Sequence, residues 1–138
     1  MRVKGQCLCK AVQFSFETKE EKHFNTCHCE MCRKWGSSPP FMVDATGGIT
    51  FQGEENITIY PSSDWAERGF CKICGSHLFY RLKKQEFYNF SLGALENRDD
   101  FTFATQIYTD AKPANYDFVN QTEMMTEQQV IEAFGFAE

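Results

Sequence analysis

The sequence predicts a mainly β domain of antiparallel sheets, with one short helix and one C-terminal helix. Apolar and polar residues alternate in several short segments, Gly, Pro, Asn and Ser cluster between the segments, and most segments follow one another without a helix-length pattern. A period of two is typical of half-buried strands. Closely spaced strands with no helix between them favour antiparallel pairing.

The alternation is clearest in AVQFSFET (11–18), where Val12, Phe14 and Phe16 share one face. It recurs in two shorter segments, ITFQG (49–53) and ITIY (57–60). Three later segments also have strand character: HLFYRL, EFYNFSLGAL and TFATQIYT. We interpret their phenylalanines as core residues, because alternating aromatic side chains suit the buried face of a sheet.

Two helices are expected. A short one covers EMCRKW (30–35), and a second covers TEQQVIEAF (126–134). In the second, Thr126 is a suitable N-cap and Gln129 occupies the capping-box position. Val130 and Phe134 lie four residues apart on one face, which predicts that the helix covers the core. Gly135 is placed to end it, with Phe136 folding back.

Length and composition indicate one domain over residues 1–138. The chain has 42% hydrophobic residues, 14 of its residues are Phe, and its net charge is −5. These values fit a globular core and exclude the basic surface of a nucleic-acid-binding protein. No signal-peptide pattern and no membrane-spanning apolar run is visible in the sequence, so we expect a cytoplasmic protein without a membrane partner.

All seven cysteines fall into three clusters, which is the strongest functional signal. The clusters are Cys7/Cys9, Cys27/Cys29/Cys32 and Cys71/Cys74. Disulfides explain them poorly, because the number is odd, a reducing compartment is expected and a bridge across one residue is strained. A redox pair at 71–74 would lack the βαβ context typical of that motif.

Metal binding accounts for the number better. Zinc takes four protein ligands in a structural site and three in a catalytic site that keeps one open position. The sequence therefore predicts two zinc ions per chain: one on Cys7, Cys9, Cys71 and Cys74, the other on Cys27, Cys29 and Cys32. Two alternatives remain open at this point. CHC could join CKIC in the closed site, or His28 could complete the triple, although neighbouring side chains of an extended segment diverge.

Three thiolates around zinc leave a net charge of −1, and sulfur ligands suit an incoming thiol. Arg33 follows the triple and could bind a substrate carboxylate or support the metal site through hydrogen bonds. Lys34 is expected to be surface charge. No general acid or base stands out, and Glu30 and Asp44 are candidates only by their nearness to the clusters in sequence.

Three motifs, GQCLCKAVQF, CHCEMCRKWGSS and YPSSDWAERGFCKICGSHLFY, resemble the glutathione-dependent formaldehyde-activating enzyme family, whose domain is shared with centromere protein V. Softer similarity continues to about residue 118. The resemblance implies a β-tent fold pinned by zinc and the same division of the cysteines into four structural and three catalytic ligands. The sequence departs from the family pattern at Lys10, where glycine is common, at Glu96, and at Asn115-Tyr116, where tryptophan is common.

The resemblance also implies an activity, in which formaldehyde adds to glutathione to give S-hydroxymethylglutathione, classed in reverse as a carbon–sulfur lyase. We therefore expect a zinc-dependent lyase that acts on a small thiol such as glutathione and a small aldehyde. The alternative is a non-enzymatic zinc-stabilised β module that binds a partner or small ligand.

Overall fold

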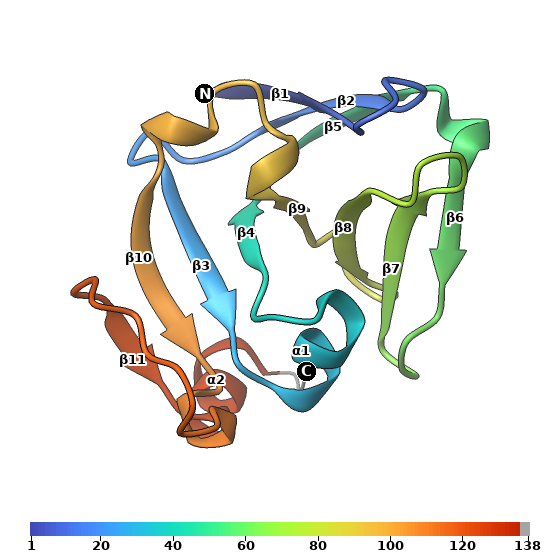
Figure 1. Cartoon of the computed structure of the whole chain (residues 1–138). Helices are drawn as coiled ribbons and strands as arrows, with labels where there is room; N and C mark the ends of the chain where they lie inside the picture. Colours follow the sequence, from blue (N-terminus) through green and yellow to red (C-terminus); the bar gives the residue numbers. More distant parts are fainter. Residues whose placement is uncertain (136–138) are drawn as a thin grey trace. The chain divides into compact units, whose positions relative to one another are not determined.

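Short strands are the most frequent elements of the structure, a computed structural model that describes residues 1–135 (Figure 1). The described chain is mainly β with two α-helices, as the sequence predicts. It divides into two compact units. The first comprises Met1–Lys22 and Met42–Phe101, and the second comprises His23–Phe41 and Thr102–Glu138, described as far as Gly135.

The first unit contains only antiparallel strand pairs within its own boundaries. One sheet has the order β1 (Arg2–Gln6), β2 (Gln13–Glu17), β5 (Gly47–Gln52). The other runs β4 (Phe41–Asp44), β9 (Tyr88–Ser91), β8 (His77–Leu82), β7 (Ala66–Cys71), β6 (Ile57–Tyr60). Three 3-10 turns also lie in this unit: η1 (Glu54–Asn56) between β5 and β6, and η2 (Leu92–Ala94) and η3 (Arg98–Asp100) after β9.

Phenylalanines form the core of the first unit. Phe14 and Phe16 on β2 stack on Phe90 of β9, with ring centroids 4.7 and 4.4 Å away. Val12, Phe14 and Phe16 are all buried. The predicted alternation in 11–18 is therefore confirmed, and stacking at these distances adds to the stabilisation from burial alone.

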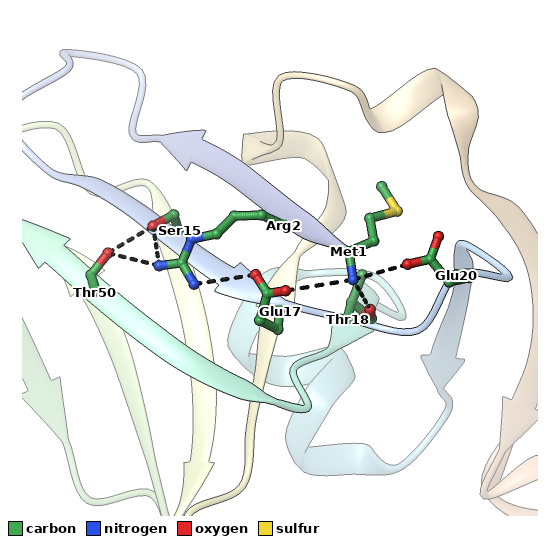
Figure 2. A network of polar contacts seen from close by, with 7 residues as sticks. All are labelled: Met1, Arg2, Ser15, Glu17, Thr18, Glu20 and Thr50. Atoms are coloured by element: carbon green, nitrogen blue, oxygen red, sulfur yellow. Dashed lines mark hydrogen bonds and ion pairs between the residues drawn. The ribbon is translucent and has the colours of Figure 1, made fainter.

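The opposite face of β2 carries a polar network (Figure 2). The Arg2 guanidinium donates hydrogen bonds to Glu17 at 3.2 Å, to Ser15 at 2.8 Å and to Thr50 at 3.3 Å. The Met1 ammonium donates to the Thr18 carbonyl at 3.0 Å and pairs with Glu17. These cross-strand contacts match the register of β1, β2 and β5, because side chains opposite one another on one face interact in pairs.

The second unit shows where the antiparallel expectation is wrong. Its strand β10 (Thr102–Ile107) pairs in parallel with both β3 (His23–Cys27) and β11 (Glu123–Met125). A long stretch of chain separates β3 from β10, and the 3-10 turn η4 (Thr109–Ala111) lies in the long connection to β11. Long connections can return the chain to the same end of a strand, which short hairpin loops cannot do.

Both predicted helices are present in the second unit: α1 (Glu30–Gly36) and α2 (Glu127–Phe134). The capping box of Thr126 and Gln129 is formed, and Gly135 adopts the left-handed conformation that ends α2. Val130 is 1% exposed, but Phe134 is 56% exposed, so the buried face of α2 is narrower than predicted. The expectation for Phe136 lies outside the described residues.

Within residues 1–135, no helix combines the length and the apolar character needed to cross a membrane.

Candidate metal centres and an adjoining cavity

The first cysteine group lies wholly in the first unit. The sulfur atoms of Cys7, Cys9, Cys71 and Cys74 lie within 4.8 Å of one another. The Cys9 Sγ is 3.6 Å from that of Cys7 and 3.7 Å from that of Cys71. A tetrahedral zinc site with Zn–S bonds of about 2.3 Å places its sulfur atoms about 3.8 Å apart. Four thiols at this spacing could therefore hold a zinc ion.

Tight turns bring these four sulfur atoms together. Cys7 accepts a backbone hydrogen bond from Lys10 at 3.0 Å, and its sulfur accepts one from the Val12 amide at 3.3 Å. Cys71 ends β7, and its carbonyl accepts from the Gly75 amide at 2.8 Å. Lys10 and Gly75 both have a positive φ, at 69° and 80°. The positive φ of Lys10 gives a physical reason why glycine suits this position.

The crowded thiols affect one another's ionisation. The Ser76 hydroxyl, with help from backbone hydrogen bonds, lowers the pKa of Cys74 to about 5. A backbone hydrogen bond involving Ala11 lowers the pKa of Cys9, but desolvation and the neighbouring thiols outweigh it and raise the pKa to about 12. Because like charges disfavour joint ionisation, all four sulfurs become thiolates together only with a cation among them.

The second group lies wholly in the second unit. Cys27 ends β3, Cys29 caps α1 and accepts a hydrogen bond from the Cys32 amide at 3.3 Å, and Cys32 lies in the first turn. Their sulfur atoms also lie within 4.8 Å of one another. All three are buried and pack with Tyr108 and Val130. The structure describes all seven cysteines as free thiols.

The structure therefore brings CLC together with CKIC and keeps the triple separate. Each group could hold a metal ion, and the thiol donors suit zinc.

His28 lies between Cys27 and Cys29 in sequence, but its ring contacts residues outside the cysteine triple. Its Nε2 lies 2.7 Å from Gln106 Oε1, and its Nδ1 lies 2.7 Å from the Tyr116 hydroxyl. With Nε2 donating to Gln106 and Nδ1 accepting from Tyr116, the imidazole is neutral, in line with burial lowering its pKa. Both ring nitrogens are thus occupied away from the cysteine triple.

Arg33 and Lys34, the two cationic residues that follow Cys32, have different environments. The Nε of Arg33 donates to the His28 carbonyl at 2.8 Å, and its Nη2 donates to the Ala111 carbonyl at 3.3 Å. Arg33 therefore ties α1 to the backbone between Cys27 and Cys29 and to η4. Lys34 instead lines a cavity. The sequence left the role of Arg33 open and indicated Lys34 as surface charge. Lys34 is indeed exposed, and it lines the cavity because α1 lies beside η4 there.

The cavity has a volume of about 510 Å³ and lies beside the triple. Ligand sites in proteins commonly span about 300–1,000 Å³. The lining residues come from α1, η4 and the start of α2: Cys29, Glu30, Met31, Lys34, Tyr108, Asp110, Ala111 and Glu127. Glu30 is thus beside the triple, as its position in sequence suggested, whereas Asp44 belongs to the other unit.

Sequence reasoning did not identify Tyr108, Asp110 or Glu127 as site residues. They approach Cys29 only because β10, η4 and α2 fold against α1, and they form no motif with the cysteines.

Comparison with known proteins identifies the class. The family model for the glutathione-dependent formaldehyde-activating enzyme matches residues 2–111. The chain therefore belongs to this family, as the three cysteine motifs predicted.

Two curated relatives and one solved structure are similar to this chain. An uncharacterised lyase of Schizosaccharomyces pombe is 39% identical over 132 residues, covering 94% of both chains. A Halomonas elongata protein, provisionally named as a glutathione-dependent formaldehyde-activating enzyme, is 30% identical over 57% of this chain and 55% of its own. A crystal structure of a Rhodobacter sphaeroides protein matches with a TM-score of 0.58 and 26% identity, over 72% of this chain and 96% of that one.

The strained turn at Lys10 gives the first prediction. Lys10→Gly should raise the free energy of unfolding by about 1 kcal/mol relative to Lys10→Ala, because only glycine relieves the left-handed conformation. Denaturant unfolding of both variants measures the difference. Equal stability of the two variants would show that this turn carries no strain.

The two cysteine groups should respond differently to substitution. Cys74→Ser should lose one bound zinc and cost several kcal/mol of stability, because a structural metal contributes its binding energy to folding. Cys29→Ser should lose the other zinc and keep a stable fold. Metal analysis and thermal unfolding check both outcomes. Equal loss of folded protein in the two variants would contradict the division into structural and catalytic sites.

Proposed function

We propose that the protein is a zinc-dependent carbon–sulfur lyase that forms or cleaves a thiol–aldehyde adduct, with glutathione and formaldehyde as the substrate pair. Family membership and the name of the S. pombe relative support a lyase. The main observation behind this proposal is that Cys29, one of three clustered buried thiols, also lines a cavity large enough for a small substrate.

The reaction forms a carbon–sulfur bond, breaks a carbonyl π bond and transfers one proton. In the forward direction, the thiol sulfur forms a bond to the aldehyde carbon, the carbonyl π bond breaks, and the thiol proton ends on the new hydroxyl oxygen. In the reverse direction, the carbon–sulfur bond breaks and the hydroxyl proton returns to sulfur. No oxidant or reductant takes part.

Cys27, Cys29 and Cys32 would hold the catalytic zinc, while Cys7, Cys9, Cys71 and Cys74 would hold the structural zinc. When bound at the triple, zinc would favour the ionised form of a substrate thiol at neutral pH. The chain's own task is to orient that sulfur toward the small carbonyl compound.

Two neighbours would keep the triple in place. Arg33 holds the His28 carbonyl between Cys27 and Cys29, and the His28 ring is fixed by Gln106 and Tyr116. We assign Arg33 to positioning, since its guanidinium contacts two backbone carbonyls on the protein itself. Such supporting hydrogen bonds orient metal ligands and tune their affinity.

We further propose that residues 1–138 work as one zinc-binding domain despite the two compact units. Each unit carries one cysteine group, so a chain with only one unit would have only one of the two metal sites.

Exchange NMR of glutathione, formaldehyde and their adduct tests the activity directly. The zinc-loaded protein should raise the rates of formation and breakdown equally and leave the equilibrium unchanged. Cys29→Ser should lower this acceleration by about 100-fold or more, since it removes a ligand of the catalytic ion. The control Lys84→Gln, at an exposed residue in the other unit, should retain it. Unchanged exchange rates with fully loaded protein would refute this function.

A further inference from the structure

Opposite charges share the cavity beside Cys29. The ammonium of Lys34 and the carboxylates of Glu30, Asp110 and Glu127 all line it. We propose that this cavity binds the zwitterionic, α-amino-acid end of the thiol substrate, with Lys34 taking its carboxylate and the acidic side chains taking its ammonium. This inference rests on the proposed function and names the part of the substrate that the protein recognises.

The charged groups are available for a ligand. Among residues 1–135, no hydrogen bond or ion pair engages the side chains of Glu30, Lys34 or Glu127. Asp110 uses Oδ1 to accept the Glu127 backbone amide at 3.0 Å. That contact fixes η4 to the start of α2, so Asp110 and Glu127 lie next to each other in the lining of the cavity.

The charged lining residues come from three different elements, which explains how one cavity can bind both a carboxylate and an ammonium group. Lys34 follows Glu30 by four residues on α1, so the two lie on one face of that helix. Asp110 and Glu127 come from η4 and α2. A ligand in the cavity thus meets a cation from α1 and carboxylates from three elements.

Charge balance makes the ammonium of the substrate the decisive group. Three carboxylates against one lysine leave the lining with an excess of negative charge. A thiol with carboxylates alone would be repelled, whereas one that also carries an ammonium group gains charge-assisted hydrogen bonds. Glutathione has such an end, with an ammonium and a carboxylate on one carbon, well separated from its sulfur.

Arg33 does not serve this purpose, although a guanidinium fork suits a carboxylate. Its hydrogen bonds to the His28 and Ala111 carbonyls direct it to the backbone. The recognition of the substrate carboxylate therefore falls to Lys34, which the sequence indicated only as surface charge.

The test compares glutathione with N-acetylglutathione, which has the same thiol and carboxylates but no ammonium. With zinc-loaded full-length protein, the acceleration of adduct exchange over the uncatalysed rate should be about tenfold larger for glutathione at subsaturating thiol. Glu127→Gln should reduce this preference, mainly by raising KM for glutathione. Lys34→Gln should raise KM for both thiols, because both keep their carboxylates. The control Glu86→Gln, at an exposed residue of the other unit, should change neither.

A binding measurement separates this inference from the proposed function. S-methylglutathione cannot form the adduct, and it should bind about tenfold more tightly than its N-acetyl derivative in an NMR titration that follows Lys34 and Glu127 amides. High salt should reduce this difference in affinity between the two thioethers, because it screens the charges. If both thiols are accelerated equally and both thioethers bind equally, the recognition proposal is wrong while the lyase function stands. If neither thiol is accelerated but the thioethers still differ, the lyase function is wrong while the binding site stands.

Discussion

The crowding of seven cysteine sulfur atoms into two groups is the constraint on which the proposed roles of both sites depend. Seven sulfur atoms lie in two groups whose members are within 4.8 Å of one another. Thiolates at such distances need a positive ion among them, because each ionised neighbour raises the cost of the next ionisation. In the first unit, the ion would join the turn after β1 to the turn after β7, two segments distant in sequence. In the second, it would join the end of β3 to the start of α1.

The two groups differ in what surrounds them, and this difference supports their separate roles. The four-cysteine group has a full set of tetrahedral donors. The three-cysteine group has one donor fewer and shares Cys29 with the wall of a cavity. The two cations after the triple differ in their contacts. Arg33 donates to the His28 carbonyl between Cys27 and Cys29, and Lys34 lines the cavity. Under the proposal, one helical turn would provide both the support of the site and part of its specificity.

Local signals in the sequence predicted the local structure. The capping box of α2, the alternation of Val12, Phe14 and Phe16, and the helix after the triple depend on residues close together in the chain, and all are confirmed. The parallel pairing of β10 and the approach of Asp110 and Glu127 to Cys29 depend on contacts between distant segments, which no periodicity encodes. Lys10 is an intermediate case. Its departure from glycine was visible in the sequence, but only the positive φ explains why glycine suits that position.

The most direct test of the central claim is the zinc content of protein purified without chelator or oxidant, combined with X-ray absorption at the zinc edge. The account predicts two zinc ions per chain, one with four sulfur ligands and one with three sulfur ligands and a lighter atom from solvent or substrate, at Zn–S distances of about 2.3 Å. Protein that contains no metal and has its cysteines joined in disulfides would contradict it.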